Sequence, residues 1–235
     1  GTDASAQRKA KKSRLVLDGS AVYVNTQVKA TPAEEKMRVK GKPGIEISPT
    51  KTVFLYPQGQ NVNQGIVEDG VAVTQGPLVS NGLKGPETAD EWGGIQNITD
   101  SARIDIFIPK NPNGQMVITC PGGGYWGLST WLEGTYVAKW MNDRGIACVV
   151  LKSRLPNGHH QVPLQDVQNA FRYCRHHAKD WGIKQIGVMG FSAGGHLAST
   201  AATMYVDSTT RPDFAALIYP VILMDENATH KGSVD

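Results

Sequence analysis

A doubly wound α/β sheet is the fold class that this sequence predicts, and three observations predict it. The run at 146–151 is continuously apolar, as in a parallel strand covered on both faces. Similar short apolar runs occur at 116–120 and 186–189, and segments with helical periodicity separate the three. At 235 residues the chain is long enough for one such domain with a large core.

The N-terminal third predicts an appendage in front of this domain. We expect residues 1–50 to form a basic tail with short antiparallel strands, because apolar residues recur there at even spacing. The basic run between Arg8 and Arg14 has no interleaved aromatic residues, which favours a solvated terminus over a nucleic-acid site. The run at 52–56 predicts the first strand of the main domain, 51–235. The tract at 58–100 is too long for a structureless loop, so we expect hairpins or a rim near the active face.

From residue 104 onward, strands and helices alternate. A helix is expected at 130–143, with four residues on its packed side: Leu132, Val137, Trp140 and Met141. A longer helix is expected at 163–182, and its apolar stripe consists of Val167, Ala170, Phe171 and Cys174. The remaining expected segments are a strand at 104–108, a hairpin-type turn at 111–114, a helix at 194–205, and a last strand at 214–223.

The chemistry centres on the segment I-G-V-M-G-F-S-A-G-G-H-L at 186–197. It contains Gly190-Phe191-Ser192-Ala193-Gly194, a G-x-S-x-G nucleophile elbow with a strand before it and a helix after it. A strained turn would lift the Ser192 hydroxyl out of the sheet, and flanking glycines avoid a clash with that turn. The N–H of Ala193 would then face a negative charge on a substrate oxygen. Small residues also collect at strand–helix turns for packing alone, so the pentapeptide by itself is a weak signal.

A second motif, Cys120-Pro121-Gly122-Gly123-Gly124-Tyr125, directly follows a predicted central strand. A triple glycine lets backbone N–H groups turn inward, as in the oxyanion loop of H-G-G-G type. A phosphate-binding loop is the alternative for a glycine run, but neither G-K-[ST] nor G-x-G-x-x-G spacing is present. We therefore expect Gly123, Gly124 and Ala193 to supply the oxyanion N–H groups for Ser192.

These motifs together resemble the α/β-hydrolase serine esterases. The resemblance rests on P-G-G-G-Y, the Glu133-Gly134 pair, R-L-P at 154–156, P-L-Q-D at 163–166 and G-F-S-A-G-G-H-L-A at 190–198. The group it is most similar to is the acetylxylan-esterase-like and feruloyl-esterase-like carbohydrate esterases of polysaccharide-degrading bacteria. The resemblance covers about 51–223 and implies an acyl-enzyme on Ser192, with Gly123, Gly124 and Ala193 as oxyanion donors.

The triad acid and histidine of this group follow the strand that matches 214–223, so we expect the hydrolase domain to be truncated there. Asp225 and His230 are the alternative pair inside the chain. His196 is expected to pack under the elbow, and His159 and His160 to belong to a loop or substrate rim. His176 and His177 are expected on a solvated helix end.

Several other residues receive a binding or packing role. Tyr125 and Trp126 could stack on a sugar or ferulate ring beside the oxyanion loop. Trp131 and Trp140 fit better as helix-packing residues, and Asp166 as a partner that pins its helix to Arg154. The three cysteines, Cys120, Cys148 and Cys174, are expected to be free buried thiols, because their number and spacing fit neither disulfides nor zinc.

The predicted function is a serine esterase that removes acetyl or feruloyl groups from a plant polysaccharide, with no metal or organic cofactor and no nucleic-acid or membrane partner. The alternatives are a non-catalytic carbohydrate-binding or interaction module and a serine peptidase of the same fold. No signal peptide is recognisable, but the chain starts at Gly1, and we expect a periplasmic or secreted location. The last strand would expose an apolar edge, so association through the C-terminal edge, as a dimer for example, is also expected.

Overall fold

The main element of the chain is a six-stranded sheet with the strand order β1-β6-β9-β7-β10-β11. The computed structural model describes residues 47–56, 67–68, 71–72, 87–90, 93–98, 102–156 and 158–223. The predicted appendage strands before residue 47 lie outside these ranges. The strands of the sheet are β1 (Lys51–Phe54), β6 (Arg103–Phe107), β7 (Gln115–Cys120), β9 (Ala147–Lys152), β10 (Gln185–Phe191) and β11 (Ala215–Ile218).

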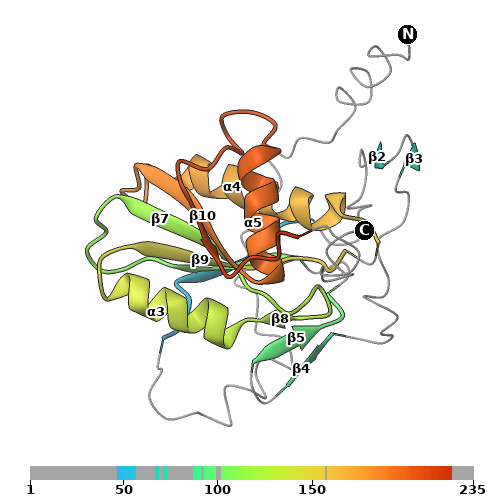
Figure 1. Cartoon of the computed structure of the whole chain (residues 1–235). Coiled ribbons are helices and arrows are strands. Elements are labelled where there is room, and N and C mark those ends of the chain that lie inside the picture. Colours follow the sequence, from blue (N-terminus) through green and yellow to red (C-terminus); the bar gives the residue numbers. More distant parts are fainter. Residues whose placement is uncertain are drawn as a thin grey trace.

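Four neighbouring strands of the sheet, β9, β7, β10 and β11, are parallel, whereas β1 and β6 add an antiparallel edge. The predicted hairpin-type turn at 111–114 is therefore wrong as a hairpin, because β9 lies between β6 and β7. The turn instead packs against the end of a helix, where the N–H of Asn113 donates to the carbonyl of Gly145 at 2.8 Å. The mostly parallel, doubly wound sheet itself is confirmed (Figure 1).

Helices cover both faces of this sheet. One face packs against α4 (Gln161–His177) and α5 (Ala193–Thr203), and the other against α3 (Tyr136–Asn142) (Figure 1). The two faces alternate along each strand: Val149 and Leu151 belong to the α4–α5 side, and Cys148 and Val150 to the α3 side. The predicted stripe of α4 is confirmed, since all four of its residues are fully buried: Val167, Ala170, Phe171 and Cys174.

The helix expected at 130–143 is split in two. A π-helical turn, η1 (Trp131–Thr135), precedes α3, and the N–H of Thr135 donates to the carbonyl of Thr130 at 2.8 Å. The extra residue of a π turn shifts the helical phase, so Leu132 is 60% exposed rather than packed. Trp140 is also 52% exposed, with the Arg144 guanidinium 3.8 Å above its ring, which corrects the expected core role of Trp140.

The last described strand, β11, is shorter than the expected 214–223. It ends at Ile218 because Tyr219 has a positive φ of 36° and Pro220 has no N–H to donate. Its side chains are half-buried or exposed, and Leu217 is 41% exposed. Within the described ranges β11 is an edge strand, so the association predicted for this edge stays a prediction.

The tract at 58–100 is described only in part. Two short strands, β2 (Val67–Glu68) and β3 (Val71–Ala72), pair with each other. The strands β4 (Thr88–Ala89) and β5 (Gly94–Gln96) form an antiparallel pair, and β5 also pairs with β8 (Leu128–Ser129), which follows the glycine loop. The antiparallel pairs agree with the expectation of short hairpins, and the pairing with β8 places the β4–β5 pair next to the glycine loop.

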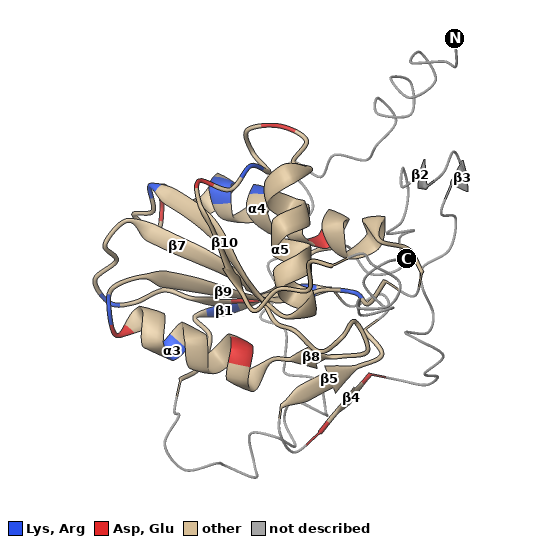
Figure 2. Ribbon diagram, viewed as in Figure 1, with Lys and Arg blue, Asp and Glu red and all other residues tan. Residues whose placement is uncertain are grey.

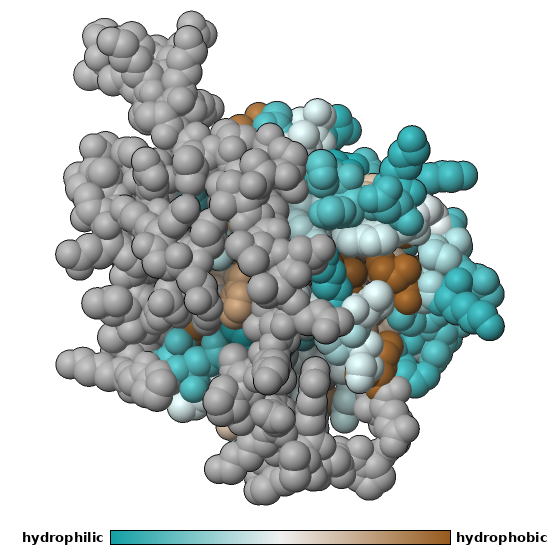
Figure 3. Space-filling model, turned by 180° about the vertical axis from the view of Figure 1, so that it is seen from behind, coloured by the Kyte–Doolittle hydropathy of each residue, from teal (hydrophilic) through white to brown (hydrophobic). Residues whose placement is uncertain are grey.

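Charged residues of both signs are scattered along the described part of the chain (Figure 2). Neither sign of charge gathers into a continuous band, and many charged residues lie at helix ends and in loops (Figure 2). Seen from behind, most described residues are hydrophilic, with small apolar groups between them (Figure 3). Among the described helices, none is both long enough and apolar enough to cross a membrane. The three cysteines, Cys120, Cys148 and Cys174, are free and buried, as predicted.

Candidate active site

The nucleophile candidate lies at the carboxyl edge of the parallel strands, where β10 turns into α5. Ser192 is the residue before α5, and its φ of 52° and ψ of −120° are unusual for a side chain with a Cβ. A backbone held in such a sparsely populated region costs on the order of 1–3 kcal/mol and is over-determined by its surroundings. Here the N–H of Ser192 donates to the carbonyl of Ile218, and the N–H of Val221 donates to the carbonyl of Ser192.

The two glycines of the elbow are required by close backbone contacts. A Cβ on Gly190 would lie 2.0 Å from the carbonyl oxygen of Gly194. A Cβ on Gly194 would lie 2.1 Å from the carbonyl oxygen of Cys120. Gly194 therefore lets the first turn of α5 approach the end of β7, which brings the elbow beside the glycine loop.

The glycine loop lies in contact with the elbow. A Cβ on Gly122 would come within 3.0 Å of the Cβ of Ser192 and 2.6 Å from the carbonyl oxygen of Phe191. The N–H of Trp126 donates to the carbonyl of Gly123 and closes the turn, and φ is positive at Gly123 (138°) and Gly124 (62°). The two motifs that the sequence separates by a helix, a strand and another helix thus lie side by side.

Three predicted oxyanion donors surround this contact. Gly123 is exposed and Gly124 is half-buried, and in the part of the chain that the structure describes neither N–H has an acceptor. Ala193 begins α5, so its N–H is one of those that a helix leaves without an intrahelical acceptor. The N–H of Gly122 cannot serve, because it donates to the Glu133 carboxylate at 2.6 Å.

Tyr125 and His196 form a pair next to the elbow. The Tyr125 hydroxyl and His196 Nδ1 are 2.9 Å apart, and the two rings meet edge to face. Burial lowers the pKa of His196, and the nearby His160 lowers it further. His196 is therefore a hydrogen-bonding and packing partner of Tyr125, and the segment that carries His160 lies on the same side.

Among the described residues, no histidine is hydrogen-bonded to the Ser192 hydroxyl. The alternative pair Asp225 and His230 lies outside the described residues. His176 is exposed at the end of α4. His177 is half-buried and stacks on the Trp181 ring at 5.3 Å, so only His176 fits the expected solvated helix end.

The predicted ring-binding residues differ in accessibility. Trp126 is 47% exposed beside the glycine loop, so its ring can meet a substrate. Tyr125 is 9% exposed with its hydroxyl on His196, which leaves it a packing role. Burial raises the pKa of Tyr125 above its ordinary value, so the hydroxyl stays protonated.

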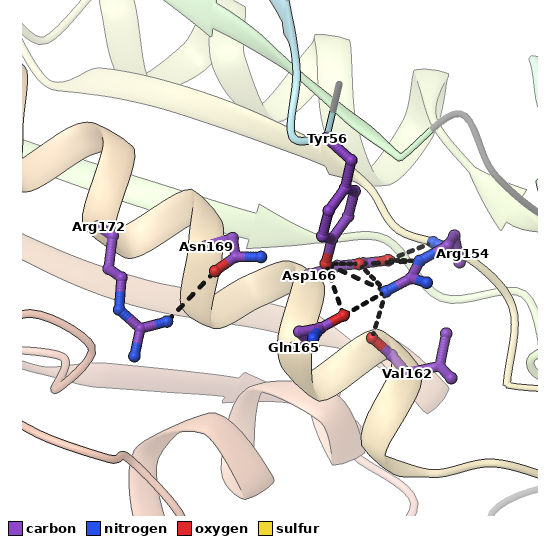
Figure 4. A network of polar contacts seen from close by, with 7 residues as sticks. All are labelled: Tyr56, Arg154, Val162, Gln165, Asp166, Asn169 and Arg172. Atoms are coloured by element: carbon purple, nitrogen blue, oxygen red, sulfur yellow. Dashed lines mark hydrogen bonds and ion pairs between the residues drawn. The ribbon is translucent and has the colours of Figure 1, made fainter. Parts of the chain in front are cut away.

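Asp166 is buried away from the nucleophile, as predicted. Its carboxylate pairs with the Arg154 guanidinium at 2.7 Å, and neither side chain is exposed to solvent. The Tyr56 hydroxyl donates to Asp166, and Arg154 also donates to the Gln165 amide oxygen (Figure 4). Burial alone would lower the pKa of Arg154, but the Asp166 carboxylate and Tyr56 raise it above its ordinary value.

Two side chains at the site were not predicted to act there. The Glu133 carboxylate accepts hydrogen bonds from the Gly122 N–H and from the Tyr219 hydroxyl. The sequence offered one signal for Glu133: the Glu133-Gly134 pair is among the motifs shared with the esterases, but the motif alone predicts no role for the carboxylate. Tyr219 carried no signal, because its position depends on the pairing of β11 with β10.

Within the described ranges, no group of His, Cys, Asp or Glu side chains is arranged to hold a metal ion. The site therefore consists of a strained serine, backbone N–H groups and one carboxylate. Residues 104–229, more than half of the chain, match the BD-FAE family. The chain belongs to the BD-FAE family.

Similar proteins agree with this membership of the BD-FAE family. An acetylxylan esterase of Xylanibacter ruminicola is 45% identical over 141 residues, which are 58% of this chain and 29% of that protein. Endo-1,4-beta-xylanase B of Butyrivibrio fibrisolvens is 33% identical over 134 residues, which are 50% of this chain and 21% of that protein. The chain thus spans less than a third of either curated relative.

A solved structure gives the fold. The acetyl ester-xyloside bifunctional hydrolase from Caldicellulosiruptor lactoaceticus is 34% identical, with a TM-score of 0.51, over 57% of this chain and 54% of that chain. Together with the parallel sheet, this likeness identifies the BD-FAE chain as an α/β-hydrolase fold. The likeness to the Caldicellulosiruptor lactoaceticus hydrolase extends over little more than half of either chain.

Proposed function

We propose that this chain carries the nucleophile and oxyanion hole of a serine carboxylic ester hydrolase that acts on carbohydrate esters. The observation that carries the proposal is the contact between the strained Ser192 and the glycine loop at Gly122. Membership of the BD-FAE family and the likeness to an acetylxylan esterase and an acetyl ester-xyloside hydrolase support it.

In the proposed reaction the Ser192 hydroxyl attacks the ester carbonyl and forms an acyl-enzyme, with release of the sugar hydroxyl. The N–H groups of Gly123, Gly124 and Ala193 stabilise the negative charge on the former carbonyl oxygen. A histidine, oriented by an acid, takes the serine proton and gives it to the departing sugar oxygen, then activates the water that releases the carboxylic acid and frees Ser192. Both partners follow Ser192 in this fold, and we place them after residue 223.

The finer assignments are part of the same proposal. We favour acetyl over feruloyl as the acyl group, because the names of two relatives specify acetyl esters. The exposed Trp126 ring is the proposed surface for a sugar. A periplasmic or secreted location would match a polysaccharide substrate.

A fluorophosphonate probe tests the proposal, since it labels only an activated serine. Intact-mass spectrometry of the complete enzyme, which supplies the triad histidine and acid, should find one adduct, mapped to Ser192 and absent from Ser192→Ala. Ser199→Ala, on the same helix with its hydroxyl on the His196 carbonyl, is the matched control and should be labelled fully. Wild type and Ser199→Ala should hydrolyse p-nitrophenyl acetate equally well, and Ser192→Ala should not.

The outcomes separate the alternatives. Absence of any adduct on the complete wild-type enzyme would favour a non-catalytic module. Labelling followed by turnover of a peptide amide but no acetyl ester would favour a peptidase. Faster release of ferulate than of acetate from matched xylan fragments would overturn the acetyl assignment.

A further inference from the structure

We propose that Glu133 is a positioning residue for this site: its carboxylate holds the Gly122 peptide against Ser192 and so aims the next two N–H groups at the substrate oxygen. The inference rests on the proposed function for its catalytic consequence. Its structural part, the restraint on the loop, stands on contacts alone.

The first step is the restraint on Gly122 itself. Its N–H donates to Glu133 Oε2 at 2.6 Å, and its carbonyl accepts from the Ser129 N–H at 2.8 Å. Both polar groups of this residue are therefore held, from opposite sides. Gly122 lies close enough to Ser192 that an added Cβ would come within 3.0 Å of the Ser192 Cβ, so its position sets where the following peptides lie.

The second step is the restraint on Glu133. Its backbone carbonyl accepts from the Thr119 hydroxyl at 3.0 Å, which ties it to the strand that leads into the glycine loop. It also lies in the π-helical turn η1, a rare conformation that is frequent at functional sites. The carboxylate is thus carried by backbone that is itself fixed to β7.

The third step is the other carboxylate oxygen. The hydroxyl of Tyr219 donates to Glu133 Oε1, although Tyr219 is 63% exposed as a whole. Tyr219 adopts a positive φ of 36°, which turns it out of the strand direction at the end of β11. The same segment is hydrogen-bonded to the elbow, through the Ile218 carbonyl and the Val221 N–H.

These contacts close a ring around the nucleophile. It runs from Ser192 to the segment 218–221, through Tyr219 to Glu133, and through Gly122 back to Ser192. Glu133 is the member that joins the oxyanion loop to the rest of the ring. Removing its carboxylate would release the Gly122 N–H and the Tyr219 hydroxyl together.

The test compares Glu133→Ala with Glu133→Gln, because glutamine keeps an acceptor for Gly122 and can donate to the Tyr219 hydroxyl. Glu133→Ala should lower kcat for p-nitrophenyl acetate roughly 10- to 100-fold with little change in KM, as misplaced catalytic groups do. Glu133→Gln should stay within roughly 3-fold of wild type, and Tyr219→Phe should fall between the two. Asp143→Ala is the control: it removes an exposed carboxylate that pairs with Lys139, and kcat and KM should not change.

Amide hydrogen exchange gives a readout that does not need activity. In Glu133→Ala, exchange at residues 122–124 should accelerate, whereas exchange in the sheet and in Asp143→Ala should not. If the complete wild-type enzyme takes no fluorophosphonate label, the proposed function fails, and this exchange experiment still decides whether Glu133 restrains the loop.

Three results would overturn the inference. One is a Glu133→Ala variant with wild-type kcat and wild-type exchange at 122–124. Another is a fall in Tm with neither kcat nor loop exchange changed, which would indicate a purely structural role. The third is a Glu133→Gln variant whose kcat falls as far as that of Glu133→Ala, because the charge of the carboxylate, rather than the position it gives the loop, would then account for the effect. Should Glu133→Ala fail to fold, Tyr219→Phe with unchanged kcat and exchange would refute it.

Discussion

Two strand–helix junctions at the same edge of the sheet are held together by opposite means, one by backbone contacts and the other by side chains. Strand β10 joins α5 through Ser192, using a strained backbone and glycines in close contact. Strand β9 is tied to α4 through Arg154 and Asp166, using side chains in a buried ion pair. The first junction leaves backbone N–H groups free for a ligand, and the second uses the polar groups of both side chains internally. The difference separates a junction built for chemistry from one built for rigidity.

The largest expected effect breaks the rigid junction. Arg154→Met leaves the Asp166 carboxylate buried without its partner, so the free energy of unfolding should fall by about 3–5 kcal/mol in urea titrations. Arg154→Met combined with Asp166→Leu should recover part of the loss, because no unpaired charge remains. Lys139→Ala removes an exposed pair with Asp143 and should cost only about 0.5 kcal/mol. Equal losses in the buried and exposed single variants would contradict the contrast.

The next effect breaks the chemical junction without unfolding it. Gly124→Val forces a branched side chain to a φ of +62° and should displace the oxyanion N–H groups. We expect kcat to fall by about 100- to 1,000-fold, and by more than KM rises, because such donors act in the transition state. Gly182→Val is the matched control, since that glycine has a φ of +69° with open space around it. A change confined to KM would assign the loop to substrate binding.

A smaller effect tests the strain at the nucleophile. Ser192→Gly relieves the positive φ of 52° and should raise the free energy of unfolding by about 1 kcal/mol, while esterase activity is abolished. Ser192→Ala keeps a Cβ and should lose activity without this gain. Thermal unfolding of the two variants side by side measures the difference. Equal stability of glycine and alanine at this position would show that the turn stores no strain.

The smallest effect is the pH dependence of the chemical junction. Since burial lowers the pKa of His196, the unfolded state binds more protons as pH falls from about 7 to 5. Stability should therefore decline across this range, and His196→Gln should flatten the decline in urea titrations at each pH. His177 contributes in the same direction, because its pKa is also lowered by burial. Ser199→Ala, on the same helix and without a titratable group, is the control, and a slope reduced equally by both variants would contradict the assignment.

Much of the fold could be read from apolar patterns, and the exceptions have identifiable causes. The runs that became β7, β9 and β10 are buried on both faces, and such runs require no distant partner to be recognised as strands. The exposed Trp140 and Leu132 were assigned to the core because a regular α-helix was assumed. A π turn depends on the glycine loop and Thr119 that surround it, and local periodicity does not encode it.

The sequence by itself determined the two glycine motifs, their order and the identity of Ser192 as the candidate nucleophile. Local chemistry suffices there, because glycine tolerates close backbone contact and positive φ where other residues do not. Only the tertiary structure decided that Gly122 lies next to Ser192, with no room for a Cβ between them, and that Glu133 and Tyr219 join the loop to the elbow. Gly122, Ser192 and Tyr219 follow the ends of three different strands, and Glu133 lies in the π-helical turn η1. They meet because folding places those strands side by side in one parallel register, which local sequence does not specify.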